Sequence, residues 1–236
     1  MSAPVTAMVL AAGVGSRMRP LTDTQPKALV QVAGKPLIDH VLDRLADAGV
    51  ERAVVNVHHF AEQLEAHLAA RSRPSVQISD ERAGLLDSGG GIHRARALLG
   101  DDPIWVANID SLWIDEGLPP LEAMKAAWDP EVMDCLLLLV QRGRGIGFEG
   151  PEGFWRDADG RLVHSRDPLK PTPFANVGFQ ILKPQILEME TDAAFSILPT
   201  WRRLSAQGRL FGVPMEAFWM HVGDLAAQEA AEARLR

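Results

Sequence analysis

The sequence has a single cysteine, so it cannot form an intramolecular disulfide. Cys135 begins an apolar run that ends at Val140, a setting that predicts a buried core side chain rather than a nucleophile. No apolar stretch approaches the roughly 20 residues that a membrane-spanning helix needs. The apolar run over residues 7–12 follows no basic residue and is too short for the core of a signal peptide. These absences favour a cytoplasmic protein without a membrane partner.

Positive charge is also scarce, with 24 lysines and arginines against 31 aspartates and glutamates and a net charge of −7 at pH 7. This balance argues against a nucleic-acid partner or an anionic membrane surface. An anionic nucleotide would therefore have to be attracted by a local group of cations. The 236 residues, 47% of them hydrophobic, are enough for one α/β domain, and they leave a monomer or a small homo-oligomer open.

Residues 9–29 carry the most informative pattern. An apolar run over residues 8–11 predicts a buried strand, and a turn with Gly13 and Gly15 follows it. Glycines let backbone N–H groups approach a ligand closely, and successive N–H groups in a turn form a concave site for an anion. Arg17 and Lys27 add positive charge that suits phosphate. The two glycines alone would fit an ordinary loop, but strand, turn and cations together favour a polyphosphate site.

The spacing excludes two common phosphate loops. The dinucleotide fingerprint needs a third glycine where this chain has Met18, and it needs a helix directly afterwards. Pro20 and Pro26 prevent a helix from starting that early. The NTPase P-loop ends in Gly-Lys-Ser/Thr, and this chain has glycine, serine and arginine at residues 15–17.

Strand and helix patterns alternate along the chain. They predict an α/β fold, a Rossmann-like, mostly parallel mixed sheet flanked by helices, in a single domain over residues 1–236. The expected strands cover residues 8–11, 53–57, 76–78, 104–108, 135–140 and 176–181, with a hairpin over 154–163. The expected helices cover residues 37–48, 61–70, 118–128, 184–187 and 195–204, one from about residue 90, and one from 225 to the end.

Two further stretches point to a ligand. Residues 85–92 contain three successive glycines at an expected helix start, with Asp87 or Ser88 as the cap, and a helix start suits negative charge. A flexible loop is the alternative for this stretch alone.

Asp110 follows the expected strand 104–108, at the sheet edge where ligands of α/β proteins bind. A carboxylate there suits Mg²⁺, although a lone aspartate more often caps a turn.

The run from residue 10 to 27 reads L-A-A-G-x-G-x-R-M-x-P-L-T-x-x-x-P-K and resembles the signature of the sugar-1-phosphate nucleotidyltransferases. Length and later motifs are most similar to the short bacterial N-acetylmuramate-1-phosphate uridylyltransferases, which implies a role in peptidoglycan recycling. The resemblance is strongest in the N-terminal half and loose over residues 141–173. It implies a nucleotide-binding half over about 1–140, and a sugar-binding lid and C-terminal part over about 141–236.

The resemblance also implies roles for individual residues, each at a position that matches a family motif. The implied catalytic residues are Arg17, Lys27 and Asp110. The implied nucleotide contacts are Leu10, Ala12, Gly13, Gly15, Glu81 and Gly89. The implied sugar contacts are Asn108, Lys170, Asn176 and Gly178. The implied metal ligands are Asp110, His221 and Asp224. Ile109 stands where the family has a small residue, and the motif around Lys170 matches only in part.

His221 occupies the place of the second metal-binding aspartate in the family motif W-x-D-V/I-G-T. Imidazole is a poor ligand for Mg²⁺ and a good one for Mn²⁺, Co²⁺ or Zn²⁺. His221 could bind the metal directly or through a water, or Asp224 could take over the role. A histidine packed beside Trp219 without any metal is the fourth possibility.

The expected reaction joins a nucleoside triphosphate, UTP by resemblance, to a sugar-1-phosphate and releases pyrophosphate. The expected cofactor is Mg²⁺, with Mn²⁺ or Co²⁺ as the alternatives that His221 leaves open. A guanylyl- or thymidylyltransferase for mannose- or glucose-1-phosphate is the first alternative. The second is a catalytically inactive regulatory subunit that binds nucleotide sugars, which the departures at Ile109 and His221 keep open. Intact Arg17, Lys27 and Asp110 weigh against it.

Overall fold

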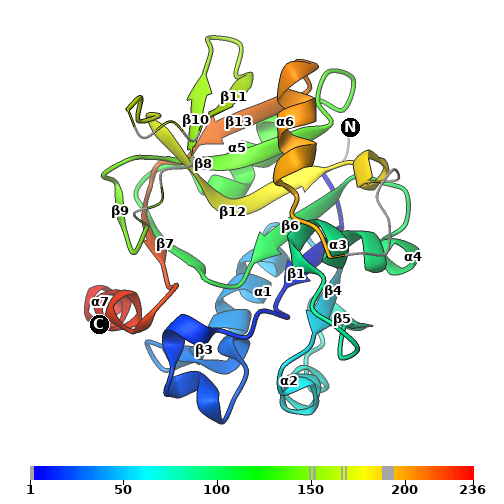
Figure 1. The fold of residues 1–236 in the computed structure, drawn as a ribbon, viewed down its shortest axis with the longest axis vertical. Coiled ribbons are helices and arrows are strands. Elements are labelled where there is room, and N and C mark those ends of the chain that lie inside the picture. The colour runs from blue at the N-terminus through cyan, green and yellow to red at the C-terminus, as the bar shows by residue number, and fades with distance from the viewer. Residues whose placement is uncertain (1–2, 149, 151–152, 166, 168, 188–193) are drawn as a thin grey trace.

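A nine-stranded mixed β-sheet forms the centre of the computed structural model (Figure 1). The structure describes residues 3–148, 150, 153–165, 167, 169–187 and 194–236. The main strand order is β11-β10-β12-β6-β1-β4-β5, and β8 and β13 continue from β12. The strands of this sheet are β1 (Thr6–Leu10), β4 (Arg52–Val57), β5 (Ser75–Asp80), β6 (Ile104–Asn108), β8 (Cys135–Gln141), β10 (Gly153–Arg156), β11 (Leu162–Ser165), β12 (Phe174–Leu182) and β13 (Leu210–Pro214).

The strand directions explain where a ligand site forms. β1 runs parallel to both β4 and β6, so the carboxyl ends of these three strands lie at one edge. β12 runs antiparallel to β6 and to β8, so its second half pairs with β6 and its first half continues past the end of β6. The central strands are buried on both faces, which is why they read as continuous apolar runs. The expected mixed sheet with flanking helices is confirmed.

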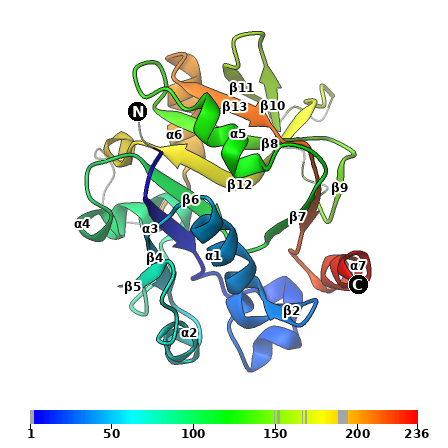
Figure 2. The ribbon, with the colours of Figure 1, turned by 180° about the vertical axis from the view of Figure 1, so that it is seen from behind.

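Helices cover both faces of the sheet (Figures 1 and 2). One face packs against α1 (Leu37–Asp47), α2 (Ala61–Leu68) and α5 (Pro120–Ala127). The other packs against α3 (Asp87–Arg94), α4 (Arg96–Leu99) and α6 (Leu198–Ala206). Each face has its own apolar cluster, as the helical spacing of the sequence predicts. No helix among the described residues is long and apolar enough to cross a membrane.

The described part of the chain also forms two smaller sheets. β14 (Ala217–His221) pairs antiparallel with β7 (Ser111–Asp115) and parallel with β9 (Gly145–Ile146). The short pair β2 (Gln31–Val32) and β3 (Lys35–Pro36) contacts the C-terminal helix α7 (Leu225–Leu235). In the register of β7 and β14, the last residue of β14 lies opposite the first residue of β7. This register brings the C-terminal part of the chain to the end of β6. The described residues also form the short 3-10 helices η1 (Ser16–Met18), η2 (Leu21–Asp23), η3 (Lys27–Leu29) and η4 (Pro184–Leu187).

Several elements differ from the sequence prediction. α3 starts at Asp87 rather than near Gly90, and no side chain caps it. Ser88, an expected cap, instead accepts a hydrogen bond from the Ile197 N–H at 3.1 Å. The predicted helix over 195–204 begins only at Leu198, because the preceding segment is held in extended contact with α3. β7 and β13 were not predicted from the sequence.

Candidate active site

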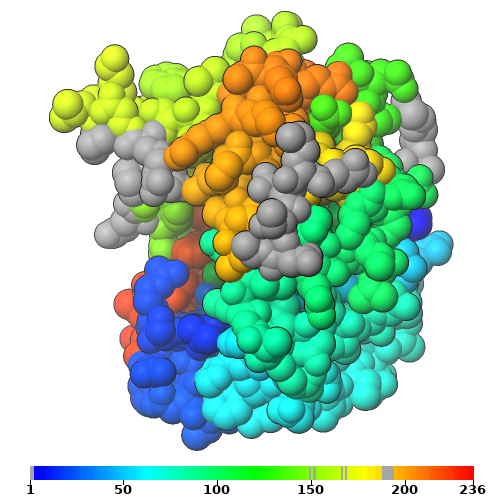
Figure 3. All heavy atoms as spheres, turned by 45° about the vertical axis from the view of Figure 1, so that its right-hand side comes forward, coloured from blue at the N-terminus to red at the C-terminus, as the bar shows by residue number. Residues whose placement is uncertain are grey.

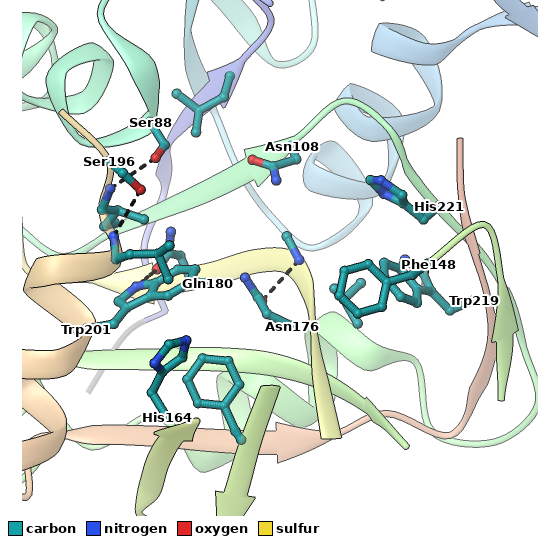
Figure 4. A pocket seen from close by; sticks show the side chains of 16 residues that line it. Ser88, Asn108, Phe148, His164, Asn176, Gln180, Ser196, Trp201, Trp219 and His221 are labelled. Atoms are coloured by element: carbon teal, nitrogen blue, oxygen red, sulfur yellow. Dashed lines mark hydrogen bonds between the residues drawn. The ribbon is translucent and has the colours of Figure 1, made fainter. Parts of the chain in front are cut away.

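A cavity of about 240 Å³ lies where the end of β6, the first half of β12 and the end of β14 meet (Figure 4). Its lining combines amide, hydroxyl, imidazole and aromatic groups. The lining residues are Leu10, Ser88, Asn108, Phe148, Phe154, His164, Asn176, Val177, Gly178, Gln180, Ser196, Ile197, Leu198, Trp201, Trp219 and His221. Four of the sequence-predicted contacts, Leu10, Asn108, Asn176 and Gly178, therefore face one cavity, together with His221.

The first loop folds back so that Lys27 reaches the end of β6. The Lys27 Nζ donates a hydrogen bond to Asp110 Oδ2 at 2.6 Å, and the two side chains are only 10% and 16% exposed. Gly15 has a φ of +65°, and a Cβ there would lie 2.9 Å from side-chain atoms of both Lys27 and Thr22. The Thr22 hydroxyl in turn donates to the Gly15 carbonyl at 2.8 Å. Glycine is required at residue 15 by both conformation and space.

Asp110 also faces His221. The antiparallel pairing of β7 with β14 places the His221 Nδ1 3.9 Å from Asp110 Oδ1. Burial alone would raise the pKa of the Asp110 carboxyl, but the charge of Lys27, the charge that His221 carries when it is protonated, and the Lys27 hydrogen bond lower it below its ordinary value. Burial is the main cause that lowers the pKa of His221, and Lys27 and Arg17 lower it further against the attraction of Asp110. Near pH 7 the two shifts favour an ionised carboxylate opposite a neutral imidazole.

This pair fits a divalent cation. Asp110 Oδ1 is buried and has no hydrogen-bond partner in the described part of the chain, so it retains an acceptor that a cation would satisfy. A neutral imidazole and a carboxylate together suit Mn²⁺ or Co²⁺ at least as well as Mg²⁺. No group of three or more potential ligands occurs among the described residues, so the pair would hold the metal together with oxygens of the substrate.

Asp224 and Arg17 lie beside this pair. Asp224 is the N-cap of α7, and its Oδ1 accepts a hydrogen bond from the Ala227 N–H at 2.9 Å. This capping bond already occupies one oxygen of the carboxylate that could replace His221 as a ligand. The exposed guanidinium of Arg17 lies next to Gly223, where an added Cβ would be 3.3 Å from the Arg17 Nη2. Arg17 is therefore available to a phosphate at the rim.

A buried polar network joins the first loop to the second glycine segment. Asn56 Oδ1 accepts hydrogen bonds from the backbone N–H groups of Ala11 and Ala12 at 2.6 and 3.2 Å. Asn56 Nδ2 donates to Glu81 Oε1 at 2.8 Å, and Glu81 is 2% exposed. Burial raises the pKa of the Glu81 carboxyl, against the lowering effect of the Asn56 hydrogen bond. Ala12 and Glu81, both expected nucleotide contacts, are engaged with Asn56 in this structure.

The N–H groups at the start of α3 are also engaged. Gly89 and Gly90 each donate to the Phe195 carbonyl at 3.0 Å, and a Cβ at Gly89 would lie 2.4 Å from the Phe195 ring. The Phe195 N–H donates to the Leu86 carbonyl at 3.0 Å. The segment before α6 thus packs directly on α3, and Figure 3 shows the yellow-orange residues that lead into α6 extending down to the teal-green surface of the N-terminal half. Gly89 makes this close approach possible.

The amide groups at the centre of the cavity are fixed by a bulge in β12. The register between β8 and β12 shifts between Asn176 and Gln180. Gly178 has a φ of +90°, and a Cβ there would lie 2.8 Å from Asn108 Nδ2. The Gly178 N–H donates to Asn176 Oδ1 at 3.0 Å, which orients the Asn176 amide. The bulge therefore requires glycine and brings two amide side chains together.

Two predicted residues lie apart from this cluster. Lys170 is exposed and is not among the residues that line the cavity. Gly13 is exposed in the first loop, with no heavy atom within 4 Å of an added Cβ, so its backbone is open to a ligand. Pro168, which belongs to the same sequence motif as Lys170, lies outside the described residues.

Sequence reasoning missed the aromatic wall of the cavity. Phe148, Trp219 and His221 form one aromatic group, with ring centroids 5.5 to 6.1 Å apart. Phe154 and Trp201 form a second group at 6.0 Å. Phe148 and Phe154 lie in the part of the sequence where the family resemblance is loose, whereas Trp201, Trp219 and His221 lie beyond it. The available signal was the number of aromatic side chains between residues 148 and 219.

Comparisons with known proteins agree with this geometry. Residues 7–187 match the family model described as the MobA-like NTP transferase domain. The chain is 54% identical to N-acetylmuramate alpha-1-phosphate uridylyltransferase of Caulobacter vibrioides over 99% of this chain and 98% of that protein. It is 35% identical to the protein of the same name from Neisseria meningitidis serogroup B, over 96% of each chain.

The fold matches that of a solved nucleotide-sugar enzyme. The structure of UDP-glucose pyrophosphorylase complexed with UDP-glucose superposes with a TM-score of 0.80 at 19% identity, covering 99% of this chain and 98% of that one. This likeness supports the fold, and the sequence relatives support the family. The chain therefore belongs to the MobA-like NTP transferase domain family and, within it, to the sugar-1-phosphate nucleotidyltransferases.

Proposed function

We propose that this protein is an N-acetylmuramate α-1-phosphate uridylyltransferase that forms UDP-N-acetylmuramate and pyrophosphate from UTP and the sugar phosphate. The observation that carries this proposal is the 54% identity to a protein of that name over nearly the full length of both chains. The proposal places the enzyme in the cytoplasm and in peptidoglycan recycling, since N-acetylmuramate is a sugar of peptidoglycan.

The reaction is the attack of an oxygen of the sugar phosphate on the α-phosphorus of UTP, and pyrophosphate is the leaving group. Both reactants are anionic, so neutralising and aligning them is the main task of the protein. Lys27 and Arg17 would neutralise the phosphates. Lys27 is held in place by Asp110 at 2.6 Å, so it approaches the phosphates from a fixed direction. No side chain has to act as a nucleophile.

The remaining predicted contacts divide between the two substrates. The backbone at Gly13 and Gly15, with Leu10, would border the nucleotide, and we place this function in residues 1–140. Asn108, Asn176 and the Gly178 bulge would hydrogen-bond the sugar phosphate, and residues 141–236 supply most of the remaining cavity wall. Gly89 would contact the nucleotide only from a conformation in which the Phe195 carbonyl releases its N–H.

A divalent cation would be held by Asp110 Oδ1 and His221. The unsatisfied Oδ1 and the neutral imidazole support this assignment. When bound, the cation would neutralise charge on the phosphates and orient them. Among Mg²⁺, Mn²⁺ and Co²⁺, the imidazole favours the latter two.

The test is pyrophosphate release with purified protein. UTP, GTP, dTTP and CTP are each combined with the 1-phosphates of N-acetylmuramate, N-acetylglucosamine, glucose and mannose, in Mg²⁺ and then in Mn²⁺. We expect the highest kcat/KM for UTP with N-acetylmuramate-1-phosphate. A higher value for GTP with mannose-1-phosphate would replace this proposal by a guanylyltransferase. Nucleotide binding without pyrophosphate release in any combination would indicate a regulatory subunit.

A further inference from the structure

The cavity wall carries little charge. Among the described residues that line it there is no lysine, arginine, aspartate or glutamate, and the ionisable side chains are two histidines, His221 and His164. His221 lies at the end near Asp110. Figure 4 shows His164 at the opposite end, beside Trp201, with Asn108 and Asn176 in between. The two imidazoles therefore mark the two ends of one cavity.

The chemistry of the proposed substrate gives the cavity a direction. The phosphate on C1 of the sugar belongs at the end with Lys27, Asp110 and His221, where cationic groups and the candidate metal ligands are found. The sugar ring then lies toward the amides of Asn108 and Asn176. N-acetylmuramate differs from N-acetylglucosamine by a lactyl ether on O3, which carries a methyl group and a carboxylate. This substituent extends away from C1, toward the end that holds His164.

The surroundings of His164 suit both parts of the lactyl group. His164 lies on β11 directly opposite Phe154 on β10, and their rings are in edge contact with centroids 5.3 Å apart. The Phe154 ring is 2% exposed and lies 6.0 Å from the ring of Trp201. These aromatic rings offer an apolar surface to a methyl group. They also keep water from the imidazole, which strengthens a hydrogen bond to a carboxylate.

We propose that His164 is a specificity-determining residue that donates a hydrogen bond to the lactyl carboxylate of N-acetylmuramate-1-phosphate. His164 is then a substrate contact remote from the reacting phosphates, and it selects the sugar without taking part in the chemistry. This inference rests on the proposed function, because it names the group that distinguishes the proposed substrate from N-acetylglucosamine-1-phosphate.

The test compares two sugars in matched variants. His164→Phe keeps an aromatic ring against Phe154 and removes both nitrogens, whereas His164→Gln keeps a hydrogen-bond donor. His59→Phe is the control, because His59 does not line the cavity. The kcat and KM values are measured with saturating UTP for N-acetylmuramate-1-phosphate and for N-acetylglucosamine-1-phosphate, and the melting temperature of each variant is recorded.

We expect His164→Phe to lower kcat/KM for N-acetylmuramate-1-phosphate by about 10- to 100-fold, mainly through KM, as for the loss of one hydrogen bond to a charged group. The value for N-acetylglucosamine-1-phosphate should change less than threefold. His164→Gln should retain part of the preference, and His59→Phe all of it. An equal fall for both sugars, or no fall for either, would overturn the inference. A parent protein that does not prefer N-acetylmuramate-1-phosphate would instead overturn the proposed function, and the inference with it.

Discussion

At the scale of single residues, the centre of the site is the contact between Lys27 and Asp110. Each was predicted from the sequence as a separate group, one for phosphate and one for metal. The structure shows them as a buried ion pair at 2.6 Å between residues 83 positions apart in the chain. Such a pairing could not be predicted, because it depends on how the first loop folds onto the end of β6. The pair links the fold of the loop to the chemistry of the site.

Replacing Asp110 by asparagine should therefore reduce both stability and activity. The substitution keeps the shape but leaves the Lys27 ammonium buried without a counter-charge, which costs about 3 kcal/mol of unfolding free energy. The double variant Lys27→Met with Asp110→Asn should recover most of that loss, and both variants should lose at least about 100-fold in activity. Urea unfolding and pyrophosphate release measure the two effects.

Asp115→Asn is the control for this substitution. Its partner Arg44 lies 3.3 Å away, but the Asp115 side chain is 42% exposed. Loss of this pair should cost less than about 1 kcal/mol. Two results together would contradict the structural role of the Lys27–Asp110 pair. The first is that Asp110→Asn is as stable as Asp115→Asn, and the second is that the double variant gains no stability over Asp110→Asn.

At the scale of elements, helical and strand periodicity predicted those segments whose fold depends on local apolar patterns. α1, β4, β6 and β8 lie within a few residues of their predicted bounds. β13 was not predicted because Gly212 and Pro214 are residue types that usually interrupt strands. In the structure, Gly212 permits close packing, since a Cβ there would lie 2.5 Å from a methyl group of Leu139. β7 was not predicted because it is stabilised by pairing with β14, which lies about a hundred residues away in the sequence.

Within the candidate site, the sequence predicted the first loop, Asp110 and the amides of β12, because each of these lies in a recognisable sequence motif. It could not indicate that the N–H groups of Gly89 and Gly90 bond the Phe195 carbonyl, because no motif encodes that long-range contact. The sequence also predicts a sugar-phosphate contact for Lys170, which stays a prediction; in this structure Lys170 is exposed and is not among the residues that line the cavity. Contacts made by residues 141–173 depend on how the folded chain packs, and no sequence pattern predicts that packing.

The contact between α3 and the segment before α6 gives a prediction at this scale. Gly89→Ala would place a methyl group 2.4 Å from the Phe195 ring, so it should lower the unfolding free energy by about 1–3 kcal/mol. Adding Phe195→Ala should relieve the clash, so that the double variant is destabilised by less than the sum of the two single variants. Denaturant unfolding of the four proteins completes a double-mutant cycle.

The matched control for Gly89→Ala is Gly84→Ala. An added Cβ at Gly84 meets no heavy atom within 4 Å, so its stability should stay within about 0.5 kcal/mol of the parent. Additive effects of Gly89→Ala and Phe195→Ala would contradict a direct contact between these two residues.

At the scale of the whole molecule, one carboxylate forms ion pairs with two cations and thereby connects three strands of the C-terminal half. Asp134 precedes β8, and it binds Arg209, just before β13, and Lys183, just after β12, at 2.9 and 2.8 Å. The hydrogen bond from Arg209 is the main cause that lowers the pKa of Asp134 from 3.8 to about 2; burial opposes it, and the hydrogen bond and charge of Lys183 support it. The three strand ends are thus held together by one carboxylate.

This lowered pKa makes stability depend on pH in a defined window. Since the pKa is lower in the folded state, the contribution is fully present above pH 3.8 and is lost as the pH falls through about 2. Solvent screens this partly exposed group, so its contribution is about 1 kcal/mol. Urea unfolding of the parent and of Asp134→Asn should differ by that amount at pH 6 and converge near pH 2. A difference that stays constant over this range would contradict the lowered pKa.

At the scale of the whole molecule, the proposed function requires that the protein join UTP to N-acetylmuramate-1-phosphate in preference to the sugar phosphate without the lactyl group. The most direct measurement is a competition in one vessel, in which UTP meets equal concentrations of N-acetylmuramate-1-phosphate and N-acetylglucosamine-1-phosphate. The UDP-sugar products are then separated and identified by mass. We expect UDP-N-acetylmuramate to form in large excess at early times. A product mixture dominated by UDP-N-acetylglucosamine, or no UDP-sugar at all, would contradict it.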